Sequence, residues 1–291
     1  DMAEAAHLAH PPAMTEAEEL DCPDWLVPLL RDSLGPQFAP VMAALRERAP
    51  VFLRVNVARA DRAEALAALA RDGIEARACA IADTALEVVS GARRVQRARA
   101  YADGLVELQD AASQAVVAAL DLAPGMRVLD LCAGGGGKAL ALAARLGTEV
   151  LAHDANPARM ADLPARAARA GARITPVAPP EGAGPMDLVL ADVPCSGSGS
   201  WRRDPEGKWR LTPERLSALR DTQAGIMDRA AGLVAEGGRL AYATCSLLTA
   251  ENDDQVAAFL GRHSGWRLAH SARWTPLQGC DGFFLAVLTR R

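Results

Sequence analysis

The sequence predicts a doubly wound α/β domain with a mostly parallel sheet, preceded by a smaller α+β domain. After Gly104, short apolar runs alternate with helical patterns, which is typical of a parallel sheet covered by helices. A run of glycines and two cysteines stand directly after these apolar runs. Open α/β sheets bind ligands at the carboxyl ends of their strands, so these residues are candidates for a ligand site. A length of 291 residues, 50% of them hydrophobic and 23% charged, supports a large core and excludes a disordered chain, a collagen and a coiled coil.

The chain divides into three segments. Residues 1–23 are rich in alanine and glutamate, contain two adjacent prolines, and are expected to form a loose leader. Residues 24–104 are expected to form the smaller domain, and residues 105–291 the larger one. The smaller domain begins with apolar residues at helical spacing over 24–48, interrupted at Gly35, and this pattern predicts two short helices.

The remainder of the smaller domain combines strand and helix patterns. Residues 51–57 alternate in polarity like a strand, and Asp61 is placed to cap a helix that extends to about Arg71. A small β-α-β unit is therefore expected. The segment 87–104 carries several arginines without a clear period, so it is either a basic connector or a solvated face.

The larger domain shows a regular succession of elements. Its apolar runs are short and contiguous, as expected of strands that are buried on both faces. The expected order is a strand at 128–131, a helix from about 137, a strand at 149–154, a helix across 157–170, a strand at 187–192, a helix near 213–235 and a strand at 239–244.

Charge and hydropathy restrict the setting of the protein. The formal net charge is −4, but residues 1–36 alone carry −7, so the rest of the chain is mildly basic. That balance permits a nucleic-acid surface without requiring one. Because the chain has neither a long uninterrupted apolar run nor a basic, apolar start, we expect a cytoplasmic protein without a membrane span.

The six cysteines lie too far apart in sequence to form a close pair of zinc ligands. We therefore expect no metal site, and because a cytosolic chain of this size rarely contains a disulfide framework, the thiols are expected to be free. Each cysteine is then either a small core residue or a thiol with a chemical role. The sequence neighbours of each cysteine must separate these alternatives.

A buried strand, a carboxylate, four glycines and the start of a helix follow one another over 128–138. A Walker phosphate loop is excluded, because Cys132 and Ala139 occupy two of its required positions. A dinucleotide fingerprint fits weakly, with Asp154 placed to bind a ribose. A site for S-adenosylmethionine (SAM) fits as well, with Asp130 and Lys138 meeting the amino-acid part of the ligand.

Two further motifs place cysteines after strands. One strand ends at Asp192 and is followed by Cys195 in a loop rich in glycine and serine, and another ends just before Cys245. Parallel neighbours would bring both thiols and the carboxylate to one cleft beside the glycine loop. Two core cysteines that fall at these positions by chance are the alternative.

These residues carry a resemblance to a known family. From about Trp25 to Leu288 the chain resembles the Sun/Fmu family of RNA (cytosine-5) methyltransferases, which has a Rossmann-like SAM-dependent methyltransferase domain. The family usually has a proline where Gly135 stands. The matching motifs, in order, are LRVN (53–56), LQDAASQ (108–114), VLDLCAGGGGK (128–138), DVPCSGSG (192–199), TCS with Glu251-Asn252 behind it (244–252) and DGFFLAVL (281–288).

The resemblance implies a covalent mechanism. Carbon 5 of cytosine is a poor nucleophile, so a thiolate first adds to carbon 6 and the ring then attacks the SAM methyl group. By resemblance Cys245 is the nucleophile, Asp192 contacts the cytosine ring and the cofactor, and Cys195 assists loss of the carbon-5 proton. In the alternative arrangement, that of DNA cytosine-5 methyltransferases, the Pro-Cys motif supplies the nucleophile.

The resemblance also implies a set of residues around the cofactor. Asp154 would bind the ribose hydroxyl groups with Arg159 nearby, and Asp192 lies at the edge of the same site. The glycine loop would hold the methionine part of SAM. The loop residues concerned are Cys132, Ala133, Gly134, Gly135, Gly136, Gly137 and Lys138.

Basic and aromatic residues alternate directly after the Cys195 loop, a pattern suited to phosphates and stacked bases. A basic loop with its tryptophans in the core is the alternative. By resemblance the smaller domain also lies on the RNA. The expected RNA-binding residues are Arg54, Asn56, Arg202, Arg203, Lys208 and Trp209, with Trp201 and Arg210 in the same segment.

The target base must be unpaired or flipped out to reach a cysteine. We expect a cytosine in structured RNA, ribosomal RNA first and transfer RNA second, and a monomeric enzyme. Two other functions are compatible with parts of the pattern: a dinucleotide-dependent oxidoreductase, and an RNA-binding or assembly protein without catalysis. A dehydrogenase would need a group for hydride transfer that the sequence does not show, and both cysteines argue against a non-catalytic binder.

Overall fold

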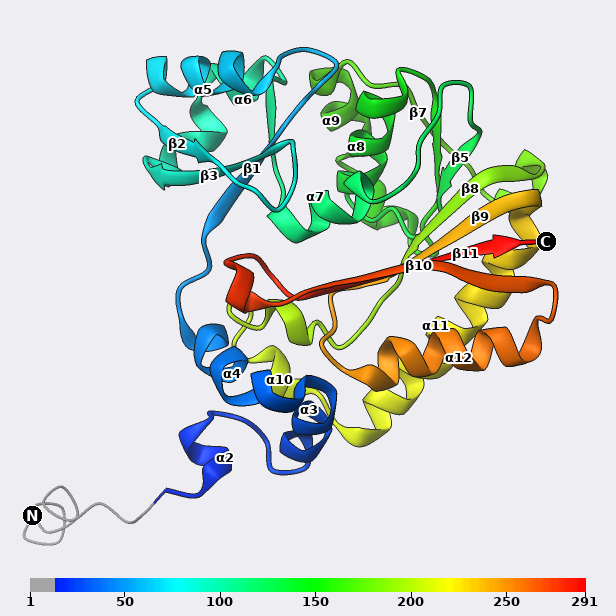
Figure 1. Ribbon diagram of the computed structural model, residues 1–291. Helices are drawn as coiled ribbons and strands as arrows, with labels where there is room; N and C mark the ends of the chain where they lie inside the picture. Colours follow the sequence, from blue (N-terminus) through cyan, green and yellow to red (C-terminus); the bar gives the residue numbers. More distant parts are fainter. Residues whose placement is uncertain (1–13) are drawn as a thin grey trace, which may run out of the picture.

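The computed structural model describes residues 14–291, and Figure 1 shows two sheets with the helices that cover them. The predicted leader lies outside the described residues up to residue 13. Its remaining part contains the short helix α2 (Glu16–Glu19), which begins with a capping box formed by Thr15 and Glu18. Within residues 14–291, no helix has both the length and the apolar character needed to cross a membrane.

The smaller sheet has the strand order β2-β3-β1-β4, and every neighbouring pair is antiparallel. The predicted strand and helix are present, and Asp61 caps the helix by accepting the Glu64 amide. Because β3 lies between β1 and β2, the β-α-β unit is split. The elements are β1 (Val51–Val55), α5 (Arg62–Arg71), β2 (Glu75–Ala78), β3 (Ala85–Ser90) and β4 (Val106–Leu108).

The structure decides between the two alternatives for the segment 87–104 and moves the expected domain boundary: its arginines are exposed, as in a solvated face, and it is not an irregular connector. The segment 87–104 is largely regular structure, because it contains the end of β3, the turn η2 (Ala92–Arg97) and the short helix α6 (Arg99–Ala102). Strand β4 pairs with β1, so the small sheet extends beyond the expected boundary at Gly104.

The two predicted N-terminal helices are α3 (Leu26–Leu34) and α4 (Phe38–Arg46), separated by η1 (Gly35–Gln37). Their apolar faces do not pack on the small sheet. They share a core cluster with Trp201, Leu211, Leu216, Leu247 and Leu248 of the larger domain. Figure 1 accordingly shows α3 and α4 beside α10, away from β1 and β3.

The larger sheet has the order β10-β11-β9-β8-β5-β6-β7. The pairs from β9 to β7 are parallel, and β11 and β10 add an antiparallel edge, so the prediction of a mostly parallel, Rossmann-like sheet is confirmed. The strands are β5 (Val128–Asp130), β6 (Val150–Ala152), β7 (Ile174–Pro176), β8 (Met186–Asp192), β9 (Val234–Thr244), β10 (Trp266–Trp274) and β11 (Phe283–Arg290).

Side chains of the central strands alternate between two cores. In β8, Leu188 and Leu190 face the core under α7 and α8, whereas Val189 and Ala191 face the core under α11 and α12. The predicted helix over 157–170 is interrupted, and Pro164 lies in the first turn of its second part, where a missing amide is tolerated. The main helices are α7 (Ala111–Ala118), α8 (Gly137–Leu146), α9 (Leu163–Ala170), α11 (Pro213–Leu233) and α12 (Asp253–Arg262).

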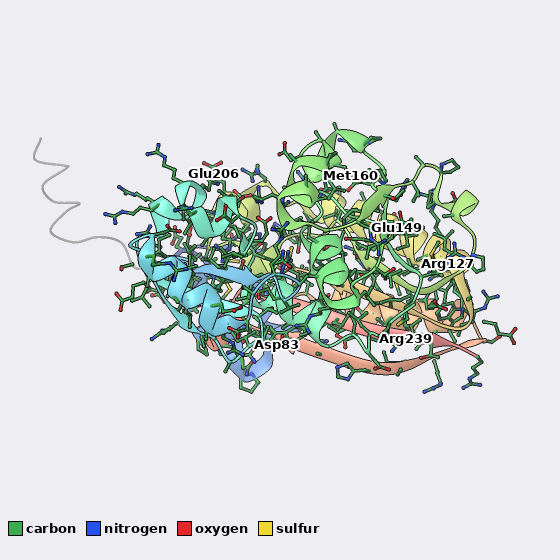
Figure 2. The ribbon with its side chains drawn as sticks, turned by 90° about the horizontal axis from the view of Figure 1, so that it is seen from above. Asp83, Arg127, Glu149, Met160, Glu206 and Arg239 are labelled. Carbon is green, nitrogen blue, oxygen red and sulfur yellow. The ribbon has the colours of Figure 1, made fainter. Side chains whose placement is uncertain are left out.

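Most of the short helical segments of the larger domain lie in loops near the carboxyl ends of its parallel strands, whereas residues 180–183 lead into the start of β8, where Arg127 donates a hydrogen bond to Ala183. In Figure 2, Arg127, Glu149 and Arg239 mark the opposite end of the sheet, where β5 and β6 begin. The site described below therefore lies at the other end. These short segments are η3 (Pro157–Met160), η4 (Pro180–Ala183), η5 (Ser198–Ser200), α10 (Gly207–Arg210), η6 (Thr249–Glu251) and η7 (Pro276–Gln278).

Candidate active site

The glycine loop joins β5 to α8 and is held from two sides. Gly134 and Gly136 have φ angles of 51° and 80°, values that residues with a Cβ rarely adopt. The Gly134 amide donates a hydrogen bond of 2.9 Å to Asp154, which follows β6. From the smaller domain, the Arg54 guanidinium donates a 2.6 Å hydrogen bond to the Gly137 carbonyl oxygen. The loop is therefore preorganised with its carboxylate neighbour.

Asp130 ends β5 beneath this loop and is fully buried. Neither of its carboxylate oxygens has a well-aligned hydrogen-bond partner among the described residues, although the Ala139 amide is close enough to lower its pKa slightly. Burial, and then the negative charge of Asp192, raise the pKa of Asp130 to about 7. An unpaired buried carboxylate requires a cation, and the α-ammonium group of SAM is such a cation. The residues present thus fit SAM.

Lys138 and Asp192 form a partly buried ion pair across the site. The Lys138 ammonium lies 2.6 Å from the Asp192 carboxylate and 4.9 Å from the centre of the Phe283 ring. Lys138 comes from the first turn of α8 and Asp192 from the end of β8, so the pair joins the glycine loop to the loop of Cys195. The ammonium group fixes the orientation of the carboxylate.

Cys195 and Cys245 lie side by side, with their Sγ atoms 3.4 Å apart. The pKa of Cys245 is lowered, because the Cys195 thiol donates a hydrogen bond to its sulfur and Lys138 and Ser200 add smaller contributions. The pKa of Cys195 is raised, because it is the donor of that bond and is buried. Of the two sulfurs, Cys245 is therefore the better thiolate.

A buried carboxylate holds both cysteine loops together. Glu251 accepts hydrogen bonds from the amide and hydroxyl of Ser196, which follows Cys195, and from the hydroxyl of Ser246, which follows Cys245. Gln223 of α11 donates a fourth hydrogen bond, of 2.9 Å. Four donors satisfy the buried charge of Glu251, so the spacing of the two thiols is built into the fold.

A cavity of about 460 Å³ opens in front of Cys245, between the two domains. Cys245 lines this cavity, whereas Cys195 and Asp192 do not. Its walls come from β1, from the segment after β4 and from the motif before β11. The residues that line the cavity include Phe52, Gln109, Asp110, Arg203, Asp281 and Phe283.

The structure corrects the predicted basic loop. The side chain of Arg202 is only 4% exposed and pairs with Asp281, and Lys208 is buried against Asp21. Trp201 is buried in the core, so it cannot stack on a base. Charges that are neutralised inside the protein are unavailable to phosphates. Of the residues named in this segment, Trp209, Arg210 and part of Arg203 remain exposed, and Arg210 is paired with Asp204 and Glu206.

Arg54 and Asn56 are also buried, contrary to a role on the RNA surface. Arg54 bonds the side chain of Gln109 as well as the Gly137 carbonyl oxygen. Asn56 donates 2.9 Å hydrogen bonds to the carbonyl oxygens of Gly104 and Ala170. Both residues therefore fix the smaller domain against the larger one.

The remaining predicted residues lie as follows. Asp154 is buried, and Arg159 lies 3.3 Å from its carboxylate. Burial, followed by the charge of Asp130, raises the pKa of Cys132 to about 12, so this residue stays a neutral thiol. Within residues 14–291 no group of three or more histidine, cysteine or acidic side chains is arranged to hold a metal.

Sequence reasoning assigned no role to several residues that build the site. Glu251, Asp110 and Asp281 stand inside the quoted motifs, so the motifs themselves were the available signal. Their partners are distant in sequence: Asp281 meets Arg202 and Arg203, and its amide donates to Asp110. Only the folded chain shows that Asp110, Asp281 and Arg203 converge on the cavity of Cys245.

A doubly wound sheet, a glycine loop between two carboxylates and a SAM-compatible cradle define a Rossmann-like, SAM-dependent methyltransferase. The chain belongs to the 16S rRNA methyltransferase RsmB/F family, whose model matches residues 117–288. A second model, the ferredoxin-like domain of RsmF/B-like methyltransferases, matches residues 22–96. The expected family is thereby confirmed.

Individual proteins with names from the same family are similar to this chain over most of its length. The ribosomal RNA small subunit methyltransferase B of Xanthomonas campestris pv. campestris is 34% identical over 94% of this chain and 68% of its own length. That of Vibrio vulnificus is 33% identical over 92% of this chain and 66% of its own. The chain thus spans about two thirds of these relatives. The crystal structure of PH0851 superposes with a TM-score of 0.89 at 30% identity, covering 96% of this chain and 69% of that one.

Proposed function

We propose that this chain transfers a methyl group from SAM to carbon 5 of a cytosine in RNA, through a covalent bond between cytosine and Cys245. The observation that carries the proposal is the position of Cys245, which faces the interdomain cavity while Cys195 lies behind it at 3.4 Å. A nucleophile must reach its substrate, and of the two thiols Cys245 is the one that lines the cavity.

Each residue of the site has a separate role in the proposed reaction. The Cys245 thiolate adds to carbon 6, which makes carbon 5 nucleophilic. Asp192, oriented by Lys138, holds the polar edge of the ring. SAM, when bound, would supply the electrophilic methyl group, and the glycine loop with Asp154 would hold it. Cys195 is a neutral thiol in the resting site, so it first loses its own proton to solvent. Its thiolate, a strong base because its pKa is raised, then accepts the carbon-5 proton, and the bond from carbon 6 to Cys245 breaks with its electrons returning to the Cys245 sulfur.

The names of the relatives support small-subunit ribosomal RNA as the substrate. Transfer RNA remains the second candidate from the sequence analysis. The test is to incubate the full chain with SAM and either unmodified 16S rRNA or transfer RNA, and to analyse the nucleosides by mass spectrometry. We expect 5-methylcytidine from the 16S rRNA alone. Methylation at another atom would contradict the proposal, and RNA binding without methyl transfer would favour a non-catalytic role.

A further inference from the structure

An open groove lies on the smaller domain, with a volume of about 600 Å³. One wall is the segment that leads from α4 into β1, and the other is the end of β3 with the turn that follows. The two segments meet at the same end of the small sheet, where Val51 pairs with Val88. The groove is lined by Arg48, Ala49, Pro50, Val51, Glu87, Val88, Val89, Ser90, Gly91, Ala92, Arg93 and Arg94.

The charge of this groove is positive. Arg48, Arg93 and Arg94 are exposed, and among the described residues none of the three forms an ion pair with an acid. Glu87 is the acid in the lining, and Arg77 already pairs with it at 2.8 Å. Three guanidinium groups around a small apolar floor, on which Val89 is 54% exposed, suit a chain of phosphates and sugars.

The groove and the cavity of Cys245 meet at Val51, the first residue of β1, which lines both spaces. At the junction, Arg203 of the cavity donates a 3.1 Å hydrogen bond to the carbonyl oxygen of Pro50 in the groove. A strand whose base enters the cavity can therefore extend its backbone past Arg203 and Val51 into the groove.

We propose that this groove, lined by Arg48, Arg93 and Arg94, binds the RNA backbone beside the target nucleotide. The inference rests on the proposed function, since it takes the Cys245 cavity as the site of the target base. It replaces the segment 202–210 as the main cationic contact, because the charges of Arg202 and Lys208 are used inside the protein.

The first experiment measures binding. A single-stranded 15-nucleotide RNA with one cytosine is titrated with the full chain at several salt concentrations. Each lost phosphate contact lowers the salt slope of a single strand by about 0.7, so Arg93→Ala with Arg94→Ala should lower it by about 1.4. Adding Arg48→Ala should lower it by about 2.1.

The control removes two exposed arginines elsewhere. Arg215 at the start of α11 and Arg267 on β10 are exposed and have no acidic partner within residues 14–291. The double variant Arg215→Ala with Arg267→Ala loses the same net charge, and its salt slope should stay that of the unmodified chain. If both double variants lowered the salt slope equally, the loss would reflect the net charge of the protein and not the groove, and the proposal would be overturned.

The second experiment measures methyl transfer to unmodified 16S rRNA, the substrate of the proposed function. Because the groove holds backbone away from the reacting atoms, Arg93→Ala with Arg94→Ala should raise KM for RNA and leave kcat unchanged. A fall in kcat at constant KM would overturn the proposal. Weaker binding to intact small subunits with unchanged binding to naked RNA would show a protein partner instead, and would overturn it too.

The binding experiment separates this inference from the proposed function. If the chain forms no 5-methylcytidine but the groove variants still lower the salt slope, the groove binds RNA and the proposed chemistry is wrong. If 5-methylcytidine forms and the salt slope is unchanged, the groove assignment is wrong and the chemistry stands.

Discussion

The sulfur atoms of Cys195 and Cys245 lie 3.4 Å apart, although 50 residues separate them in sequence. They follow neighbouring parallel strands in which Asp192 of β8 is level with Ala243 of β9. Each loop turns back toward the other, and Glu251 binds the serine after each cysteine. The pair is therefore a consequence of strand register and of one buried carboxylate.

The two thiols should behave differently when each is removed. Cys245→Ala should abolish methyl transfer and form no covalent RNA adduct, because the addition to carbon 6 is lost. Cys195→Ala should still add and methylate, and should accumulate as a protein-RNA conjugate because release is impaired. Denaturing gels with RNA and SAM measure both. A slow band for Cys245→Ala alone would reverse the assignment.

Glu251→Gln should disturb the spacing of the thiols. An amide cannot accept all four hydrogen bonds that the carboxylate receives, so we expect a loss of stability of about 1–3 kcal/mol and a lower kcat. Oxidation by diamide should also join Cys195 to Cys245 more slowly, which a general loss of stability would not predict. The exposed Glu236→Gln is the matched control. Unchanged kcat and crosslinking in Glu251→Gln would contradict the positioning role.

Binding of SAM should depend on pH through Asp130. Burial raises the pKa of Asp130 to about 7, so the carboxyl group is protonated at lower pH and must lose its proton to pair with an ammonium group. As the pH increases from acid values toward 7, the affinity for SAM should therefore rise by up to about tenfold per pH unit. Above about pH 8 it should fall again, because the ligand amine, with an ordinary pKa of roughly 7.7–8.0, loses its charge.

Calorimetry across this range provides the measurement, and Asp130→Asn provides the comparison. The asparagine variant should bind SAM more weakly at pH 7.5 and should show no rise between pH 5.5 and 7. A flat profile for the unmodified chain would exclude Asp130 as the partner of the ammonium group.

Gly199→Ala tests the close contact between two loops of the site. An added Cβ at Gly199 would lie 2.2 Å from the Gly282 carbonyl oxygen, and a backbone atom cannot move aside as a side chain can. We expect a loss of stability of about 1–3 kcal/mol together with reduced activity. Gly225→Ala in α11 has open space and should be neutral or slightly stabilising, so denaturant unfolding of both variants isolates the contact. Equal stability of the two would refute the packing argument.

Arg202→Ala tests whether Arg202 stabilises the fold through Asp281 or contacts RNA. Arg202 and Asp281 are both almost fully buried, so removal of the cation leaves a buried carboxylate with fewer partners. We expect a destabilisation of about 3–5 kcal/mol, measured by thermal unfolding. Under conditions where the variant is folded, the salt slope of RNA binding should stay unchanged. A reduced slope without a loss of stability would restore Arg202 to the RNA surface.

Local signals determined much of this protein. The alternation of strands and helices, the Asp61 cap and the glycine loop depend on residues within a few positions of one another, and they are present where the sequence predicts them. The placement of Cys195 and Cys245 after parallel neighbours also follows from the pattern, because parallel strands end at the same edge of a sheet.

Tertiary structure alone decided which positive charges are available to RNA phosphates. Arg202 and Lys208 look like RNA contacts in the sequence, but their partners Asp281 and Asp21 lie 79 and 187 positions away and bury them. The arginines at 93 and 94 show no stronger sequence pattern, yet folding leaves them exposed along the groove of the smaller domain. The periodicity of a segment sets which of its faces is apolar, whereas the neutralisation of a charge depends on a partner that only the folded chain brings near.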